Sequence, residues 1–204
     1  MSTEPRVITD DGDRHELIAV CSRAFWHDPL FDFLANARLL TEYEVLPRVF
    51  RAALRDFDTD TSVRYAVDVD GRPRCFAAWL APGSFPRSSP EQWRRDVRSV
   101  GLLLRVSNRR RAARLLREVD RRHPHAPHWY LGLLATDPSA QGRGLGTKAL
   151  QPVLDRCDVD GVAAYTETQK HANIAWYARS GFEAIDEIRL PDTPPIWRLW
   201  RDPR

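Results

Sequence analysis

The stretch of sequence that decides the fold is Leu134-Ala-Thr-Asp-Pro-Ser-Ala-Gln-Gly-Arg-Gly-Leu-Gly-Thr-Lys-Ala-Leu150, in which an apolar strand leads through a short loop into a helix. Three glycines stand at the start of that helix: Gly142, Gly144 and Gly146. Glycine adopts backbone angles closed to other residues and has no Cβ, so its amide can approach a phosphate closely. The first N–H groups of a helix also lack internal partners and carry partial positive charge. The stretch therefore predicts a pyrophosphate-binding loop, with Arg143 and Lys148 adding full charges nearby.

Three types of phosphate-binding loop use glycines in this way, and their spacing separates them. A Walker A loop requires G-x-x-x-x-G-K-[ST], whereas here Thr147 stands between the last glycine and Lys148, so that type is excluded. The segment Gly144–Ala149 fits the dinucleotide pattern G-x-G-x-x-A, and Glu167 lies about 20 residues further on, where a ribose-binding acid belongs. However, residues 137–143 separate the strand from these glycines, where a dinucleotide-binding fold requires a tight turn. Too little chain follows to complete the doubly wound sheet of that fold, so the sequence argues against it.

The third pattern is Q-x-x-G-x-G, and it resembles the acetyl-CoA loop of the GNAT superfamily of N-acetyltransferases. The chain meets it with Gln141, Gly144 and Gly146. Further residues of the superfamily follow in its order, namely Asn173, Tyr177 and Gly181-Phe182. The six-residue pattern alone is common, so it is weak evidence. The resemblance to this superfamily depends on its combination with the residues that follow.

The resemblance extends to one branch, the puromycin N-acetyltransferase-like proteins. Ala24-Phe25-Trp-His-Asp-Pro29 resembles the end of that branch's first helix, and His128-Trp-Tyr-Leu131 resembles its entry to the central strand. Glu167-Thr168, followed by Asn173-Ile-Ala-Trp-Tyr177, has the spacing of its closing motif. The match covers most of the chain but is loose between Phe85 and Arg122, and variable regions often determine the substrate in such folds.

The resemblance implies an α/β fold of the GNAT type: a mixed, mostly antiparallel central sheet flanked by helices, in which two parallel strands splay apart and form the cleft for coenzyme A. The nearly continuous apolar run Trp129–Thr136 predicts a strand covered on both faces. A helix over Leu145–Cys157 and a strand over Val162–Thr166 then complete a right-handed parallel pair. With 43% hydrophobic residues and no linker-like segment, we expect one domain over residues 1–204.

Residue patterns elsewhere predict the remaining elements. Apolar residues at helical spacing predict helices over Leu17–Phe25, Leu39–Phe50 (with Pro47 at its start or at a kink) and Asn173–Ser180, and two more helices between Phe85 and Arg122. Alternating residues predict a hairpin of Val63–Val69 with Cys75–Leu80, and closing antiparallel strands over Phe182–Leu190 and Ile196–Arg201. Gly181 stands where the last helix should end.

The resemblance also implies the residues that bind acetyl-CoA as cosubstrate. They are Leu134, Ala135, Thr136, Gln141, Gly142, Arg143, Gly144, Leu145, Gly146, Thr147 and Asn173. Asn173 is expected to bind the pantetheine arm, because it shares a helix face with Tyr177 four residues later. Backbone N–H groups around Leu134–Thr136 are expected to polarise the thioester carbonyl.

Acetyl transfer from a thioester to an amine requires a neutral amine, a polarised carbonyl and a proton for the departing thiolate, but no metal. The resemblance gives Tyr177 the role of the acid that protonates the sulfur; packing beside Trp176 is its alternative. Glu167 is the candidate base that takes the proton of the amine, or else a cap or loop ligand. Asp28 and His27 are weaker base candidates, because a turn at Asp28 alone explains them.

An aromatic pocket is the candidate binding site for the acceptor, and the acceptor itself cannot be identified from the sequence. The candidate pocket residues are Trp26, Phe31, Trp79 and Tyr130, and each fits the core equally well. Likeness to puromycin acetylation implies a small-molecule amine, with peptide N-termini and lysines left open. A homodimer is compatible with the resemblance, although no residue pattern indicates one.

The net charge of +3 and the pI near 9.0 raise the question of nucleic acid. Most of the excess lies in one helical region, at Arg105, Arg109, Arg110, Arg111, Arg114, Arg117, Arg121 and Arg122. Apolar residues recur there at helical spacing, which places the arginines on a solvated face. Because no aromatic interleaving or recognition motif accompanies them, the sequence argues against a nucleic-acid partner.

The remaining polar and thiol residues point to the cytoplasm and away from a metal. The cysteines are odd in number and lie among apolar neighbours, at Cys21, Cys75 and Cys157, so we expect core thiols in a reducing compartment. The start lacks a secretory pattern, and no apolar run approaches membrane-spanning length. A His-rich string is formed by His123, His125 and His128, but without a nearby carboxylate it favours a turn before the central strand over a metal site.

The sequence therefore predicts a cytoplasmic acetyl-CoA-dependent N-acetyltransferase that transfers the acetyl group directly to a primary amine, most simply of a small molecule, in a ternary complex. One alternative is a ping-pong acyltransferase that uses a cysteine. A second alternative is a non-catalytic CoA-binding or arginine-rich nucleic-acid-binding module.

Overall fold

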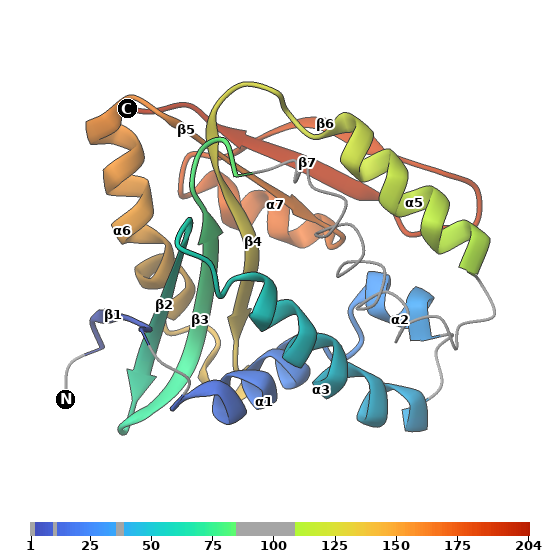
Figure 1. Ribbon diagram of the computed structural model, residues 1–204, viewed down its shortest axis with the longest axis horizontal. Coiled ribbons are helices and arrows are strands. Elements are labelled where there is room, and N and C mark those ends of the chain that lie inside the picture. Colours follow the sequence, from blue (N-terminus) through green and yellow to red (C-terminus); the bar gives the residue numbers. More distant parts are fainter. Residues whose placement is uncertain (1–2, 10–11, 36–38, 85–108) are drawn as a thin grey trace.

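The computed structural model describes residues 3–9, 12–35, 39–84 and 109–204, and within these ranges the chain forms a seven-stranded sheet (Figure 1). The strands are β1 (Pro5–Val7), β2 (Ser62–Val69), β3 (Arg72–Leu80), β4 (His128–Thr136), β5 (Ala163–Thr168), β6 (Glu183–Ile188) and β7 (Ile196–Arg201). The helices are α1 (Arg14–Ala24), α2 (Pro29–Ala35), α3 (Leu39–Asp56), α5 (Arg109–Arg122), α6 (Leu145–Asp160) and α7 (His171–Ala178), with a 3₁₀ turn η1 (Pro138–Ala140). The strand order is β1-β2-β3-β4-β5-β7-β6, and only β4 and β5 run parallel.

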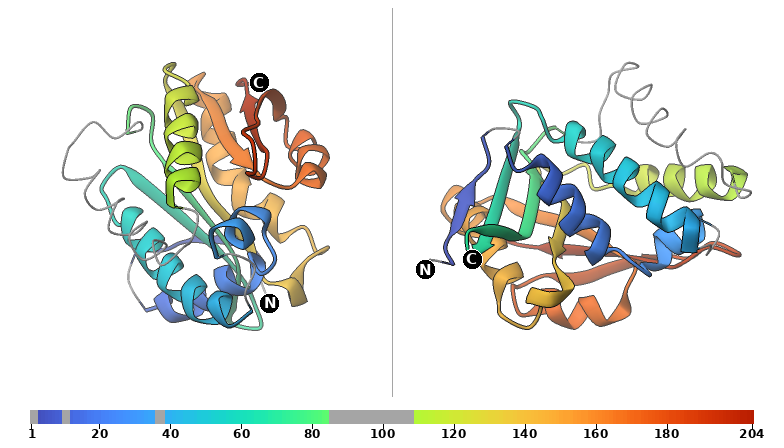
Figure 2. Two further views of the ribbon diagram at one scale, coloured as in Figure 1. Left: turned by 90° about the vertical axis from the view of Figure 1, so that its right-hand side faces the viewer. Right: turned by 90° about the horizontal axis from the view of Figure 1, so that it is seen from below.

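Helices cover both faces of this sheet. The right-hand view of Figure 2 shows α1, α3 and α5 on one face, which we call the α5 face, and α6 and α7 on the other, which we call the α6 face. Central strand β3 explains the arrangement, because its residues from Cys75 to Leu80 are buried in both directions. Cys75, Ala77 and Trp79 pack into the core with α6, whereas Phe76, Ala78 and Leu80 pack into the core with α1 and α3. Alternation along a strand thus divides one apolar run between two cores.

The decisive stretch folds as its sequence predicts. The predicted strand Trp129–Thr136 corresponds to β4, and the helix predicted behind the glycines corresponds to α6, which extends to Asp160. Gly144 begins that helix with φ +75°, and Gly161 ends it with φ +66°. Few residues other than glycine adopt such angles at low cost, so the helix bounds follow from the sequence. The mixed, mostly antiparallel sheet with one parallel pair is confirmed.

The parallel pair is short, and this opens the sheet. β5 pairs with β4 only from His128 to Leu131, with Leu131 opposite Thr166. β4 continues to Thr136 along β3, and the β3–β4 register shifts at Ala78 and Trp79, where the sheet carries a β-bulge. A bulge bends a strand and increases its twist. Beyond Leu131 the two strands therefore diverge, and the side of β4 that faces β5 is left without a strand partner in the described sheet.

Several elements differ from the sequence prediction. α7 begins at His171 and ends at Ala178, two residues earlier at each end than predicted, so Asn173 lies inside the helix and not at its start. Pro47 lies within α3. The pattern gave no sign of α2, which begins at Pro29, because a seven-residue helix carries too little periodicity. Of the two helices predicted between Phe85 and Arg122, α5 is observed, and residues 85–108 lie outside the described ranges.

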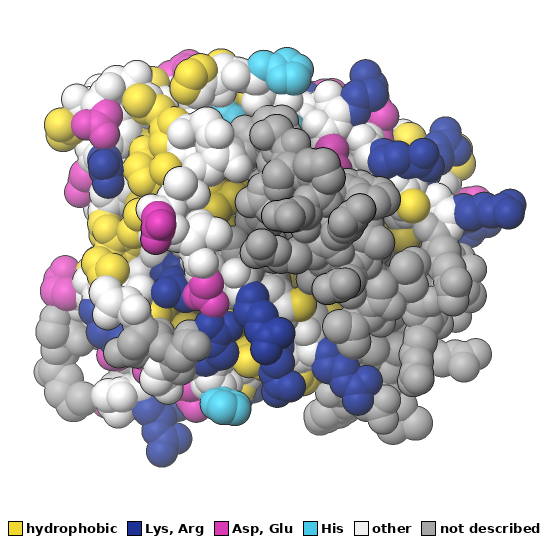
Figure 3. Space-filling model, viewed as in Figure 1, with side chains coloured by type: hydrophobic (Ala, Val, Ile, Leu, Met, Phe, Trp, Pro, Cys, Tyr) yellow, Lys and Arg dark blue, Asp and Glu magenta, His cyan; other side chains and the backbone are white. Residues whose placement is uncertain are grey.

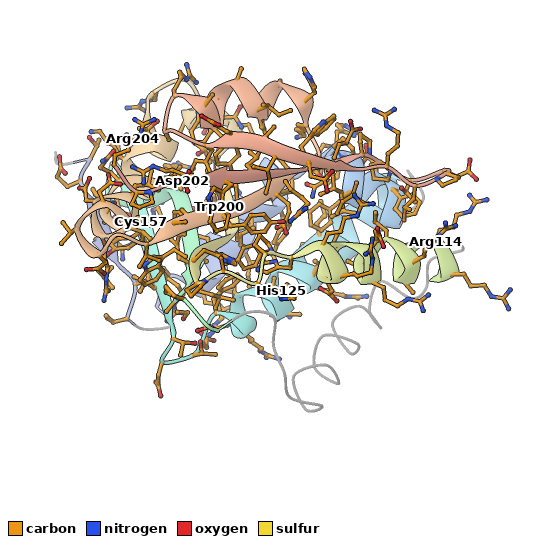
Figure 4. The ribbon with its side chains drawn as sticks, turned by 90° about the horizontal axis from the view of Figure 1, so that it is seen from above. Arg114, His125, Cys157, Trp200, Asp202 and Arg204 are labelled. Carbon is orange, nitrogen blue, oxygen red and sulfur yellow. The ribbon has the colours of Figure 1, made fainter. Side chains whose placement is uncertain are left out.

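The arginine-rich face of α5 is solvated, as predicted. Ala112 and Leu115 are buried on its inner side. The exposed arginines are Arg110, Arg111, Arg114, Arg117 and Arg121. Dark blue side chains gather at the right edge of Figure 3, on the side where Figure 1 shows α5, and Figure 4 labels Arg114 on that helix. In the described part of the chain, no helix is both long enough and apolar enough to cross a membrane.

Candidate active site

A cleft of about 640 Å³ lies on the α6 face, where β4 and β5 part. Its wall combines the glycine loop, the start of α6, the side of α7 and the end of α1. The lining residues are Ala24, Phe25, Asp28, Leu134, Thr136, Ala140, Gln141, Gly142, Gly144, Leu145, Gly146, Thr147, Lys170, Asn173, Trp176, Tyr177 and Arg179. The structure thus brings together most of the predicted coenzyme-binding residues and Tyr177, although they come from two separate segments of the chain, residues 134–147 and 173–177.

Backbone amides form one end of this cleft. Gly142 and Gly144 both have φ +75°, and a Cβ built on either glycine would meet no atom within 4 Å. The space beside these two glycines is therefore open, and no side chain blocks a close approach to their backbone or to the first turn of α6. Gly146 differs, because a Cβ there would lie 2.9 Å from the Trp176 ring. Its role is close packing of α6 against α7.

An ion-pair network holds the glycine loop in place. Asp137, between β4 and η1, is buried and accepts hydrogen bonds from Arg23 Nε of α1 at 2.9 Å and from Arg74 Nη1 of β3 at 3.3 Å. Its other oxygen accepts from Ser139 N and Oγ. Burial raises the pKa of Asp137, but the hydrogen bonds from Ser139 and Arg23 outweigh it and lower the pKa to about 2. The loop therefore starts from a fixed anchor that joins three elements.

Tyr177 lies at the other end of the cleft, in α7. Its side chain is 6% exposed and its ring packs edge-on against Trp176 and Phe182. Burial raises the pKa of Tyr177 far above its ordinary value, against a lowering contribution from its hydrogen bond with the Thr166 side chain. The phenol consequently keeps its proton at neutral pH, which a general acid requires. Packing and acid function are both compatible with this position.

The predicted pantetheine contact has a partner within the protein. Asn173 Nδ2 donates to Thr168 Oγ1 at 2.9 Å, which ties α7 to the end of β5. Gln141 Nε2 donates to the Thr136 carbonyl at 3.3 Å and closes the loop on β4. Two predicted coenzyme-binding residues do not line the cleft. Ala135 is buried in the core of the α5 face, and Arg143 is exposed.

Glu167 lies across the sheet from Tyr177. It follows Thr166, the last residue of β5 that pairs with β4. Because strand residues alternate, Glu167 points to the α5 face with Tyr165, whereas Thr166 and Thr168 point to the α6 face. Its side chain is 8% exposed. The gap between the diverging strands therefore separates the candidate acid on one face from the candidate base on the other.

The surroundings of Glu167 were not expected from the sequence. It forms hydrogen bonds with Tyr130 of β4 and Tyr165 of β5, and burial together with this carboxylate raises the pKa of both phenols. Its Oε1 lies 3.7 Å from Nδ1 of His123. His123 in turn lies 3.0 Å from His128, Nε2 to Nε2. Trp200, labelled on β7 in Figure 4, contacts the rings of His128 and Tyr165.

The turn predicted for the His-rich string lies between α5 and β4, but two of its histidines also approach a carboxylate, which the sequence did not indicate. His123 and His128 are buried, at 2% and 4% exposure, and only His125 is exposed in the loop after α5 (Figure 4). The carboxylate that they approach comes from β5, far along the chain, so no local pattern could indicate it. Among the described residues no group of three His, Cys, Asp or Glu side chains has an arrangement that could hold a metal ion.

Three of the four aromatic candidates, Trp26, Phe31 and Tyr130, pack against the core of the α5 face, and the fourth lies on the other side of the sheet. Trp79 is fully buried in the core of the α6 face, and Tyr130 lies on the α5 face beside Glu167. Phe31 packs against Phe25 and Phe50. Trp26 lines a separate hollow between α1 and η1. Strand alternation separates Trp79 from Tyr130, although the sequence presents both as strand aromatics.

A buried carboxylate that sequence analysis ranked low does line the cleft. Asp28 is 3% exposed, and burial raises its pKa. Its Oδ1 accepts from Leu30 N at 3.0 Å, and Lys170 Nζ lies 3.7 Å from Oδ2. Asp28 therefore caps α2, as the turn interpretation requires, and also joins α2 to the β5–α7 loop across the cleft.

All three cysteines are buried free thiols. Burial raises the pKa of Cys75 to about 11 and of Cys157 to about 12, and raises that of Cys21 further. Cys75 comes nearest to the cleft, because its sulfur accepts a hydrogen bond from Thr136 Oγ1 at 3.2 Å. A thiol that stays protonated is a poor nucleophile.

Comparisons with known proteins identify the fold and the family. The crystal structure of histone acetyltransferase HPA2 and related acetyltransferase from Corynebacterium glutamicum superposes with a TM-score of 0.73 at 23% identity, covering 100% of this chain and 98% of that one. Arylalkylamine N-acetyltransferase 2 from Aedes aegypti gives 0.61 at 14% identity, covering 98% and 99%. PaiA N-acetyltransferase from Thermoplasma acidophilum, in complex with coenzyme A, gives 0.57 at 11%, covering 99% of both chains. At these identities the likeness shows the shared fold. The model of the acetyltransferase (GNAT) family matches residues 77–182, more than half of the chain, and the protein therefore belongs to that family of acetyl-CoA-dependent acetyltransferases.

Proposed function

We propose that the protein is an N-acetyltransferase that transfers the acetyl group of acetyl-CoA directly to a primary amine of a small molecule in a ternary complex. One observation carries the proposal: a single cleft joins an amide-lined glycine loop to a buried, protonated tyrosine. The glycine loop is suited to bind a pyrophosphate, and the tyrosine is suited to protonate a leaving thiolate.

The glycine loop fits the diphosphate of coenzyme A. At Gly142 and Gly144 the missing Cβ atoms leave open space beside the backbone, and the N-terminus of α6 adds its partial positive charge there. Acetyl-CoA, when bound, would supply the activated acetyl group as its thioester. The loop would hold its phosphates, and Asn173 would exchange its contact with Thr168 for one with the pantetheine arm.

Tyr177 is proposed as the acid. Its raised pKa keeps the phenolic proton in place until a base appears, and a departing thiolate is such a base. Backbone N–H groups of β4 beyond Leu131, left without a parallel partner, are proposed to polarise the acetyl carbonyl. This contribution needs no special side chain.

Glu167 is proposed as the base. It lies at the opening between β4 and β5, on the face opposite to Tyr177. An acceptor amine that approaches the gap from the α5 face would therefore meet the carboxylate before the acetyl group. A carboxylate there also favours a cationic acceptor by simple attraction.

Direct transfer is favoured over a cysteine intermediate. The three thiols are buried and their pKa values are raised, so none of them is prepared to attack a thioester. Likeness to puromycin N-acetyltransferase-like proteins, carried by residues 24–29 and 167–177, supports a small-molecule amine. The arylalkylamine acetyltransferase among the structural neighbours is compatible with that class.

A thiol-release assay tests the proposed function. Acetyl-CoA is offered with a panel of primary amines that includes puromycin, arylalkylamines and a peptide with a free N-terminus, and the products are weighed by mass spectrometry. We expect amine-dependent thiol release with a small amine, and a loss of rate in Glu167→Gln. If no amine releases thiol while DNA or RNA is retained with a steep salt dependence, the non-catalytic module is the better description.

A further inference from the structure

A buried cluster on the α5 face holds two histidines and a carboxylate in a row. The row begins at the carbonyl of Ala126, continues through His128 and His123, and ends at Glu167. Its members come from the loop after α5, from β4 and from β5. The proposed function uses only the last of them.

The first two contacts fix the positions of two protons. His128 Nδ1 lies 2.7 Å from the Ala126 carbonyl, which can only accept, so Nδ1 carries a hydrogen. Burial lowers the pKa of His128, which favours the neutral ring with an accepting Nε2. His123 Nε2, 3.0 Å away, must then donate.

The same reasoning places no hydrogen between the atoms of the third contact, Nδ1 of His123 and Oε1 of Glu167. A neutral His123 that donates through Nε2 turns the lone pair of Nδ1 towards Glu167 Oε1, which is itself an acceptor. The two atoms lie 3.7 Å apart, beyond hydrogen-bonding distance, and Oε1 is buried without a hydrogen-bond partner among the described residues. Two facing acceptors out of contact with water are unfavourable, and one added proton would join them.

We propose that His123 is the positioning residue of the base: it orients the Glu167 carboxylate and shares the proton that this carboxylate takes from the acceptor ammonium. The inference rests on the proposed function. One N–H bond of the ammonium breaks, and its electron pair stays on nitrogen for the attack on the acetyl carbon. The proton forms an O–H bond on Glu167 or an N–H bond on His123, and leaves to solvent after the product departs.

Other charged and titratable groups surround the pair. Tyr130 and His128 face it from β4, Tyr165 from β5 and Arg198 from β7, where Arg198 Nε donates to the Tyr165 hydroxyl. Asp120 of α5 acts on Tyr130, and Tyr177 of α7 lies within electrostatic reach of Glu167. Apart from Glu167 and His123 themselves, these groups are phenols with raised pKa values, a neutral histidine, a permanent cation and one carboxylate. The carboxylate of Glu167 and the ring of His123, which face each other at 3.7 Å, are therefore the two groups of the cluster between which a proton can be shared.

Two substitutions of His123 separate its contacts. In His123→Asn the side-chain amide occupies the position of Nδ1 and can donate to Glu167, but it cannot reach His128. In His123→Gln the amide occupies the position of Nε2 and keeps the contact with His128, but it presents nothing to Glu167. His125→Gln is the control, because His125 is exposed three residues from His128 and outside the row.

The pH profile of kcat/KM is the first measurement, made with the amine that gives the highest turnover. A permanent amide donor stabilises the carboxylate, so the acid limb of His123→Asn should move to lower pH by about one unit. His123→Gln should lower kcat about tenfold at every pH without weakening coenzyme A binding, because the carboxylate loses its orientation. Wild-type profiles in both folded variants, with the control unchanged, would overturn the proposal.

Nitrogen NMR of the histidine rings gives a readout that needs no turnover. In the wild type, Nδ1 of His123 should show a lone pair at high pH and should titrate together with Glu167. In Glu167→Gln the amide nitrogen can donate to Nδ1, so this titration should shift to lower pH. An identical His123 titration in wild type and Glu167→Gln would refute the pair. A shifted titration in a protein that acetylates no amine would instead refute the proposed function and, with it, the catalytic role of the pair.

Discussion

The two faces of the central sheet are built in different ways. On the α6 face the cleft takes its character from backbone: glycines in the left-handed region, the first turn of α6 and the free side of β4. On the α5 face the cluster around Glu167 consists mainly of side chains, drawn from residues 123–130, from β5 and, through Arg198, from β7. A backbone site can be encoded by one continuous stretch. A side-chain site exists only after the strands have paired.

The comparison leads to different expectations for substitution. Apart from Tyr177, the backbone site on the α6 face should respond to changes of glycine or of the loop anchor and tolerate most others. A site made of side chains should respond to single functional groups. The predictions below test this contrast, from the largest expected effect to the smallest.

The largest effect is expected at Tyr177, the side chain on which the α6 face depends. Tyr177→Phe removes the phenolic proton and leaves the ring packed against Trp176 and Phe182. Turnover should fall about a hundredfold, because general acids contribute on that scale, while the dissociation constant of acetyl-CoA changes little. Steady-state kinetics beside calorimetry will separate the two. Equal losses in binding and turnover would show that the phenol only packs.

The loop anchor should give the next effect, on stability. Asp137→Asn removes the charge that Arg23 and Arg74 share, and should lower the free energy of unfolding by about 2 kcal/mol in urea denaturation. The folded carboxyl has a pKa of about 2, below its unfolded value of about 3.9. Its stabilisation is therefore complete above that unfolded value and is lost as the pH falls from about 4 to about 2.

A control variant separates the loss of the loop anchor from the general loss of an ion pair. Asp158→Asn breaks the pair with Arg201 behind α6, away from the cleft. Both variants should lose stability, but only Asp137→Asn should weaken coenzyme A binding, since only Asp137 holds the glycine loop. Equal affinities in the two variants would mean that the loop keeps its shape without the anchor.

Gly144→Val tests the backbone character of the α6 face directly. A β-branched residue at φ +75° is strained, and its side chain fills the space beside the amides, so coenzyme A should bind about tenfold more weakly by calorimetry. Gly161→Val is a matched control, because Gly161 has φ +66° and the same open space at the other end of α6. It should share the loss of stability but keep the affinity. A comparable affinity loss in both variants would point to general unfolding of α6.

The smallest effects are expected at two groups that the proposal leaves without a role. Cys75→Ala should retain turnover within about twofold, because the thiol is buried and protonated. An inactive but folded variant would support the cysteine intermediate.

The second of these groups is on α5. Arg114→Glu should change the free energy of unfolding by no more than about 0.5 kcal/mol, as is usual for a solvated position. A large change in the retention of the protein on DNA would support the nucleic-acid-binding alternative.

The sequence predicted the parts of the molecule that depend on local order. Gly144 and Gly161 mark the ends of α6 because each adopts a left-handed angle, and the apolar run of β4 indicates a strand covered on both sides. Tyr177 and Asn173, chosen by the resemblance, both line the cleft, and their roles stay predictions. By contrast, the ends of α7 were misplaced by two residues and α2 was missed, because short helices have weak signals.

The sequence by itself determined that a strand, an amide-lined loop and a helix follow one another, since this depends on glycine stereochemistry within one stretch of chain. Only the tertiary structure decided that Trp79 is core, that Glu167 lies across the sheet from Tyr177, and that β7 is inserted between β5 and β6. It also decided that His123 and His128 meet Glu167. Register and strand order set these positions, and both depend on hydrogen bonds between segments far apart in the chain, which no local pattern records.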